Sequence, residues 1–189
     1  FSAVGFGAVH YGGRAVIGMG SAPAAPGRVN TVDYIPIGTV STDAVDFGDL
    51  TRVSTESDSC SNGTRGVFFG GSIPAATNII DYITIGSTGA GTDFGDLAVV
   101  SYSFSVMSNG YKGLITGGYN GTAGSVVPFE YINITTTGNS VEQGGISPSG
   151  AQNKSSNAGV SNGSRGVYSL NSPLYSNTLE YVTISSSSG

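Results

Sequence analysis

The 189-residue chain contains no tryptophan, a single cysteine and only 10% charged residues. A lone cysteine excludes an intramolecular disulfide and a metal site built from several cysteines. No stretch approaches the roughly 20 consecutive apolar residues that a transmembrane helix needs. The net charge of −5 comes without a basic stripe, which argues against a nucleic-acid partner. We therefore expect neither membrane insertion nor nucleic-acid binding.

The residues that are abundant favour a packed β protein. Aromatic residues make up 10% of the chain and Val and Ile are common, a composition unlike that of disordered segments. Glycine occurs 31 times, and Ser and Thr are frequent, so turns and loops are well supplied. The composition therefore predicts short strands joined by many turns.

One segment occurs in four related copies. Its most complete form, residues 61–85, reads SNGTRGVFFGGSIPAATNIIDYITI, and the other copies cover residues 10–37, 108–134 and 161–184. One tyrosine per copy marks a period of about 48 residues: Tyr34, Tyr82, Tyr131 and Tyr181. Repeats of this length made of short strands are typical of propeller blades. We predict a single domain with repeats at approximately residues 1–54, 55–101, 102–156 and 157–189.

Each repeat divides into candidate strands. The first is short and rich in small residues, at 3–9, 55–60, 102–107 and 157–160. The second is apolar and follows an Asn-Gly turn in three copies, at 14–18, 65–69, 112–116 and 165–169. The third alternates with period two, at 31–37, 79–85, 128–134 and 178–184. The fourth is the outer strand, at 46–50, 93–97 and 142–146.

The last repeat offers no candidate for an outer strand, and the chain opens at Phe1 rather than at a methionine. Proteins rarely leave an unpaired strand edge bare. We therefore expect that the native polypeptide is longer or that a neighbouring subunit supplies the strand. The lone Cys60 aligns with the apolar residues Val9, Met107 and Val160, which predicts a packed thiol rather than a reactive one.

The order of apolar strand, diglycine, spacer, tyrosine-centred strand and outer strand resembles the kelch repeat over essentially the whole chain. It departs from that family in lacking tryptophan, whose usual outer-strand position holds Phe47 or Phe94. More narrowly, the pattern NTxDYxTI…TDFGDL…SNGTRGVFFGG is similar to repeats of cyanophage and other marine-phage virion proteins, often tail-fibre or appendage proteins. The kelch resemblance implies an all-β propeller with radial blades of four antiparallel strands, and no particular activity.

Two features that serve catalysis in other proteins are predicted to be structural here. Asp-Phe-Gly at residues 46–48 and 93–95 spells the kinase magnesium motif, but no other kinase motif accompanies it. Its recurrence at the repeat period indicates outer-strand structure. His10, the single histidine, aligns with a turn serine in the other copies, which argues against a catalytic triad. We expect no enzymatic activity, no metal site and no cofactor.

A cation and an acid recur together in every repeat. A basic residue begins each second strand, at Arg14, Arg65, Lys112 and Arg165. An acid directly precedes each marker tyrosine, at Asp33, Asp81, Glu130 and Glu180. Because they repeat together, we expect structural ion pairs within or between blades, which need good hydrogen-bond geometry where they are buried. The alternative is a ring of cations that binds an acidic glycan.

Loops that differ between copies form the candidate binding surface. In a kelch-type blade, the loop after the second strand and the loop between blades gather on one face. On that face the residues that offer aromatic and amide groups for a neutral sugar are Tyr119, Asn120, Asn153 and Tyr175. The alternative is that these residues are solvated loop tips.

We expect a non-enzymatic phage virion protein, part of a tail fibre or appendage, that contributes to host-surface attachment. The alternative is an extracellular, lectin-like carbohydrate-binding propeller. An oxidase or sialidase is disfavoured, because the copper-binding Cys–Tyr–His constellation and any Asp-box with Trp are missing from the sequence. The expected location is the virion or the extracellular space. The expected partners are other virion proteins, copies of the chain itself or a host-surface glycan.

Overall fold

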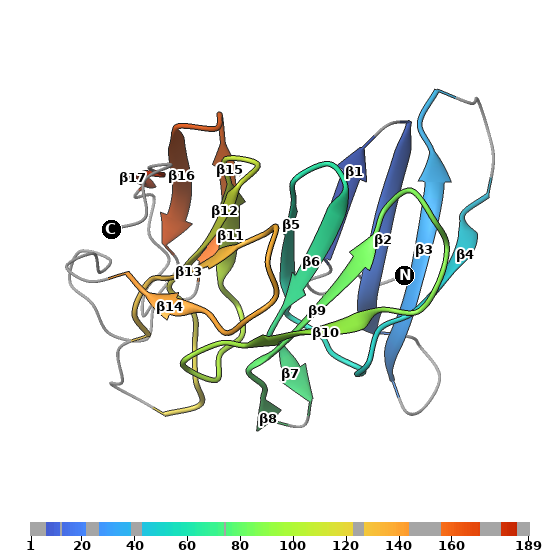
Figure 1. Cartoon of the computed structure of the whole chain (residues 1–189). Helices are drawn as coiled ribbons and strands as arrows, with labels where there is room; N and C mark the ends of the chain where they lie inside the picture. The colour runs from blue at the N-terminus through green and yellow to red at the C-terminus, as the bar shows by residue number, and fades with distance from the viewer. Residues whose placement is uncertain are drawn as a thin grey trace.

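The computed structural model consists of four antiparallel sheets of three or four strands and one short hairpin, with no helix among the described residues (Figure 1). It describes residues 7–11, 13–21, 27–38, 43–73, 75–122, 127–143, 156–170 and 179–184. Within these ranges there is accordingly no helix that could cross a membrane. The all-β class is confirmed, and each predicted repeat supplies one sheet.

Strands that follow one another along the chain lie side by side in each sheet. The strands of sheet 1 are β1 (Gly7–Tyr11), β2 (Arg14–Ser21), β3 (Arg28–Pro36) and β4 (Val45–Asp49). Those of sheet 2 are β5 (Asp58–Ser61), β6 (Arg65–Phe69), β9 (Ile79–Thr84) and β10 (Thr92–Asp96). Those of sheet 3 are β11 (Ser105–Ser108), β12 (Lys112–Thr116), β13 (Glu130–Asn133) and β14 (Val141–Glu142). Those of sheet 4 are β15 (Ser156–Ser161), β16 (Arg165–Leu170) and β17 (Leu179–Thr183). A short hairpin, β7 (Ser72–Ile73) and β8 (Ala75–Ala76), follows β6.

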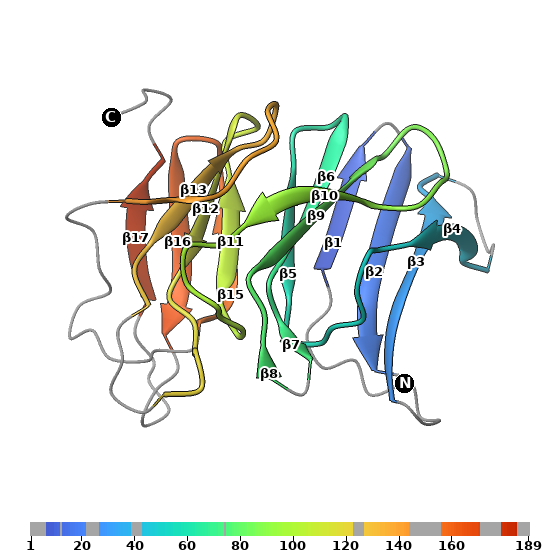
Figure 2. The same ribbon diagram turned by 60° about the horizontal axis from the view of Figure 1, so that its bottom comes forward.

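The four sheets stand in a row with their first strands adjacent. β5 lies beside both β1 and β11, and β11 lies beside β15. Figures 1 and 2 agree in placing sheet 1 at one end of the row and sheet 4 at the other. Among the described strands, no contact of comparable extent joins β15 to β1, so the row is open at its two ends.

The Asn-Gly turns predicted before the second strands are confirmed in sheets 2, 3 and 4. The side-chain oxygen of Asn62 accepts hydrogen bonds from the backbone N–H groups of Thr64 (3.0 Å) and Arg65 (2.8 Å). Asn109 and Asn162 make the same two bonds in their own turns. The asparagine thus satisfies two backbone donors where each second strand begins.

The hydrophobic core lies between neighbouring sheets, because the inner sheets are apolar on both faces. Ile80 and Tyr82 of β9 pack towards sheet 3, whereas Ile83 and the following Ile85 pack towards sheet 1. This is the alternation that the sequence predicts for the third strand, and here both sets of side chains meet a neighbour. One apolar cluster therefore forms between each pair of adjacent sheets.

The diglycine after the second strand forms a joint between successive sheets, by which we mean a place where the backbone of one sheet touches the backbone that leads into the next. A Cβ atom at Gly71 would lie 2.1 Å from the hydroxyl oxygen of Ser54 and 2.7 Å from the carbonyl oxygen of Thr55. The N–H of Gly71 donates to the carbonyl of Ser101 (3.0 Å), in the linker that leads into sheet 3. Gly20 donates in the same way to Ser54 (3.1 Å), in the linker to sheet 2. The missing side chain permits this close approach of two backbones.

The Asp-Phe-Gly motif forms a second joint on the outer strands. Phe47 and Phe94 are buried in the two clusters next to their sheets. A Cβ atom at Gly95 would lie 2.5 Å from the carbonyl carbon and oxygen of Gly138. The N–H of Gly138 donates to the carbonyl of Phe94 (2.8 Å), and Gly89 makes the equivalent bond to Phe47 (2.8 Å). The motif is therefore outer-strand structure, as predicted.

The first strands of sheets 2 and 3 begin three residues later than predicted. Glu56 and Ser103 have φ angles of +57° and +53°, which an extended strand cannot contain. The backbone N–H of Ser103 donates to the carbonyl of Glu56 (3.0 Å), and its hydroxyl donates to the Glu56 carboxylate (2.6 Å). Residues 55–57 and 102–104 therefore form a corner that ties two sheets together.

Two predictions about outer strands have different outcomes. In sheet 3 the strand β14 covers Val141–Glu142 and begins one residue before the predicted 142–146, of which residues 144–146 lie outside the described residues. In sheet 4 three strands are described, and the predicted lack of an outer strand concerns residues 185–189, which lie outside the described residues.

Replacing Gly95 with Ala is expected to lower the free energy of unfolding by about 2–4 kcal/mol, because the new Cβ meets the Gly138 backbone and φ is +146°. Gly86→Ala is the matched control, since a Cβ there meets nothing within 4 Å. Urea denaturation followed by circular dichroism measures both variants. Equal stabilities would contradict the close contact.

Candidate functional site

The cation that begins each second strand lies over the tyrosine ring of its own repeat. The distances from the charged group to the ring centroid are 4.3 Å (Arg14 and Tyr34), 4.4 Å (Arg65 and Tyr82), 4.1 Å (Lys112 and Tyr131) and 4.7 Å (Arg165 and Tyr181). All four are within the roughly 6 Å range of a cation–π attraction. Strand pairing explains the recurrence, because β2, β6, β12 and β16 each lie beside the strand that carries the tyrosine.

A phenylalanine from the outer strand completes the cluster in sheets 1 and 2. The rings of Tyr34 and Phe47 are 6.2 Å apart at 81°, and those of Tyr82 and Phe94 are 6.0 Å apart at 79°. These are edge-to-face contacts, a favoured geometry for aromatic pairs. The tyrosine is thus held between a cation and a second ring.

The same cations connect one sheet to the next. The guanidinium Nη1 of Arg14 donates to the carbonyl of Ile85 in sheet 2 (3.2 Å), and that of Arg65 donates to the carbonyl of Ile134 in sheet 3 (3.0 Å). Ile85 and Ile134 are equivalent residues, each just after the third strand of its repeat. The cation therefore contributes to an interface between sheets as well as to its own sheet.

The predicted pairing of Asp81 with a strand-initial cation is wrong, and among the described residues no ion pair joins the other three acids to these cations. Neighbouring residues of a strand point to opposite faces, so a cation over Tyr82 cannot also reach Asp81. Asp81 pairs instead with Arg52, whose Nη1 lies 2.5 Å from Asp81 Oδ2. Both side chains are buried, and this burial lowers the pKa of Arg52, an effect that the charge of Asp81 opposes.

In sheets 2 and 3 the acid before the marker tyrosine, Asp81 or Glu130, binds the linker that connects its sheet to the previous one. Asp81 accepts a hydrogen bond from the hydroxyl of Thr51 (2.6 Å) in addition to its pair with Arg52. Glu130, one methylene longer, accepts from the backbone N–H groups of Ala98 (2.9 Å) and Val99 (3.1 Å). Where the linker lacks Thr and Arg side chains, the longer acid reaches the backbone itself.

The acids of the two end sheets have other surroundings. Glu180 accepts a hydrogen bond from the hydroxyl of Tyr168 (2.8 Å), and burial, together with this acid, raises the pKa of Tyr168. Asp33 is half-buried on β3. The four acids therefore occupy the same position in the repeat, but the groups that surround them differ from one sheet to the next.

Asp58 joins the first strands of sheets 2 and 3. Its carboxylate accepts hydrogen bonds from the backbone N–H groups of Val106 (2.8 Å) on β11 and Ser59 (2.7 Å) on β5. Burial nevertheless raises the pKa of Asp58 to about 6, because desolvation outweighs these two bonds. Cys60, two residues on, is buried, and burial raises the pKa of its thiol above the ordinary value. The thiol is packed, as predicted.

Sequence reasoning missed Arg52 and Asp58. Arg52 lies in a linker, and the aligned residue in the next repeat is Val99, so no periodic signal marks it. Asp58 aligns with Ser105. Neither residue therefore belongs to the repeating pattern, which is why the periodic signal does not single it out.

The sequence-predicted binding residues have local roles where the structure describes them. The ring of Tyr119 packs edge-on against Tyr102, with centroids 5.3 Å apart, and the two residues exchange backbone hydrogen bonds (2.8 and 3.0 Å). The side-chain oxygen of Asn120 accepts from the N–H of Thr122 (2.9 Å). Asn153 and Tyr175 lie outside the described residues. A sugar-binding role for these four residues stays a prediction.

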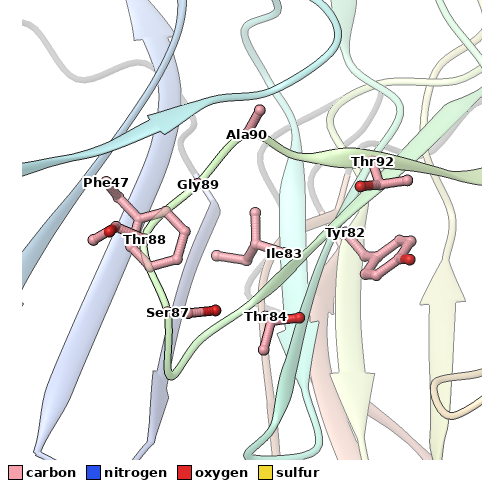
Figure 3. Close-up of a pocket in the computed structure, with 9 residues that line it drawn as sticks. All are labelled: Phe47, Tyr82, Ile83, Thr84, Ser87, Thr88, Gly89, Ala90 and Thr92. Atoms are coloured by element: carbon pink, nitrogen blue, oxygen red, sulfur yellow. The ribbon is translucent and has the colours of Figure 1, made fainter.

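A shallow hollow opens where the loop between β9 and β10 crosses sheet 1 (Figure 3). Phe47 and Ile83 form its apolar side, and Ser87 and Thr88 bring hydroxyl groups to its rim. Its volume is about 150 Å³, below the roughly 300 Å³ at which pockets for small molecules begin. This hollow offers polar contacts at a surface rather than an enclosed binding pocket.

Comparison with known proteins adds no relative. A scan against models of protein families finds no match, and a search of curated proteins finds none either. The resemblances to kelch repeats and to phage virion proteins therefore stay predictions that rest on the repeat motifs.

Replacing Asp81 with Ala is expected to lower the free energy of unfolding by about 3–5 kcal/mol, because it leaves Arg52 buried without its partner. Asp46→Ala is the control, since Asp46 is an exposed acid on β4. Urea denaturation at neutral pH measures both. A small loss for Asp81→Ala, equal to that of the control, would show that the pair does not hold the linker.

The raised pKa of Asp58 predicts a pH-dependent stability. Between about pH 4 and pH 6 the folded protein binds this proton more tightly than the unfolded chain, whose carboxyl has a pKa near 3.8. The free energy of unfolding should therefore fall by about 1–3 kcal/mol as the pH rises through this window. Burial also raises the pKa of Glu130, which adds to the fall.

Asp58→Asn isolates the contribution of Asp58. We expect this variant to lose stability less steeply than the wild type between pH 4 and pH 7, in urea titrations at each pH. Slopes that coincide for the two proteins would contradict the assignment to Asp58.

Proposed function

We propose that the chain is a kelch-like, non-enzymatic β-propeller that forms part of a phage tail fibre or appendage and contributes to host-surface attachment. The observation that carries this proposal is a small sheet that recurs four times, with an apolar cluster between each pair of neighbouring sheets. Such a sheet is stable only between neighbours, a condition that radial packing of blades meets. The motifs shared with phage virion repeats support the assignment to a virion.

The exposed loops support a role at a surface. Residues 86–90 (GSTGA) and 135–139 (TTTGN) are exposed and carry hydroxyl and amide groups without any charge. Neutral polysaccharides offer the matching hydrogen-bond donors and acceptors. The same loops support the second candidate, an extracellular lectin-like module that belongs to no virion.

Mass spectrometry of purified virions separates the two candidates. For a phage whose genome encodes this chain, we expect its peptides in the virion at an amount comparable to other tail proteins, because a fibre component is stoichiometric. Peptides found only in the cell-free medium, and absent from virions, would favour the lectin-like module.

A glycan array with host-surface polysaccharides tests attachment separately. We expect binding by the wild-type chain and weaker binding by a variant with Ser87→Ala and Thr88→Ala, because both residues border the exposed hollow. Asp46→Ala, a change on the neighbouring outer strand, is the control. Virion membership without glycan binding would leave a purely structural role.

A further inference from the structure

Sheet 4 exposes the face that the other sheets bury. Leu179 is 70% exposed, whereas its counterparts Ile80 and Phe129 are fully buried. Tyr181 is 66% exposed, whereas Tyr82 is half-buried beneath the next sheet. These side chains are on the side of sheet 4 that faces away from sheet 3, because Tyr168, Val182 and Ile184 form the side that packs against sheet 3.

The open face of sheet 4 is an apolar hollow with a cation at its edge. The hollow has a volume of about 190 Å³, and Val160, Val167 and Leu179 line it. Register places Val160 and Tyr181 on either side of Val167, so the three strands contribute to one surface. Arg165 lies exposed over the Tyr181 ring.

Sheet 1 carries the complementary face at the other end of the row. In sheets 2, 3 and 4 the face towards the previous sheet carries three large apolar residues beside the acid that precedes the tyrosine, for example Phe68, Ile83 and Ile85 in sheet 2. The corresponding residues of sheet 1 are Ile17, Ile35 and Ile37. Ile37 is 52% exposed and the other two are half-buried, with no preceding sheet against them in the described structure.

We propose that a second copy of this chain places its sheet 1 against the open face of sheet 4. The contact would repeat, between chains, the interface that the structure makes three times within one chain. Arg165 then donates to the carbonyl of Ile37 of the second copy, as Arg14 donates to Ile85 and Arg65 donates to Ile134. This inference rests on the sheet-to-sheet contacts and is independent of a virion or sugar-binding role.

The association is head-to-tail, because the two end faces differ and each fits the other rather than itself. Each copy keeps one free face after the first contact. Contacts of this kind form a closed ring when the rotation between copies closes, and otherwise an open filament. Both products have masses that are multiples of the chain mass, and both contain only this one interface.

Two variants test the inference by sedimentation equilibrium. Leu179→Asp blocks the sheet 4 face and Ile37→Asp blocks the sheet 1 face, and both residues are exposed, so the fold should persist. We expect the wild type to associate, and each variant alone to associate at least about tenfold more weakly. An equimolar mixture of the two variants should form a dimer and nothing larger, because it retains one intact pair of faces.

Val100→Asp is the control, since Val100 is an exposed apolar residue in the linker between sheets 2 and 3, and it should associate like the wild type. Protection of the buried Cys60 thiol from a thiol reagent verifies the fold of every variant. A wild-type chain that stays monomeric up to about 100 μM would overturn the inference. So would an Ile37→Asp variant that still dimerises alone, which would indicate a symmetric contact between two sheet 4 faces.

Discussion

Every sheet of this protein needs a neighbour, because apolar side chains cover both of its faces. A single small sheet with two apolar faces exposed to solvent would not be stable in water. The repeated features of the sequence follow from this need. The diglycine at residues 70–71 and the glycine of the Asp-Phe-Gly motif let adjacent backbones touch, and the cations link one sheet to the carbonyl groups of the next.

The contact between the acid and its linker and the backbone conformation at the diglycine position recur in different repeats, even where the residues differ. Asp81 holds its linker through the side chains of Thr51 and Arg52, whereas Glu130 holds the equivalent linker through two backbone N–H groups. Met19 occupies the position of the first glycine in the diglycine, and it keeps a φ of +65° at that position. The backbone follows the same path where one sheet meets the next, and different side chains stabilise that path in different repeats.

The sequence predicts the repeated sheets well because their signals are periodic. One tyrosine per repeat marks the third strand, alternation shows its two faces, and the Asn-Gly turn marks the start of the second strand. The partners of charged residues were not predictable in the same way. Arg65 and Asp81 recur in parallel, yet they point to opposite faces of sheet 2, and Arg52, which does pair with Asp81, has no counterpart in the next repeat. Co-recurrence of the cation and the acid therefore did not identify a contact, whereas the cation and the tyrosine, which recur with the same period, do lie in contact.

A row of mutually dependent sheets has a graded rather than uniform resistance to opening. In a single copy the inner sheets pack against two neighbours, whereas sheets 1 and 4 each pack against one, so we expect thermal fluctuations to detach the end sheets first. Amide hydrogens in β16 and β17 should then exchange with solvent sooner than those in β6 and β9. The order of loosening would then be set by position in the row, even though the four units share the same strand pattern.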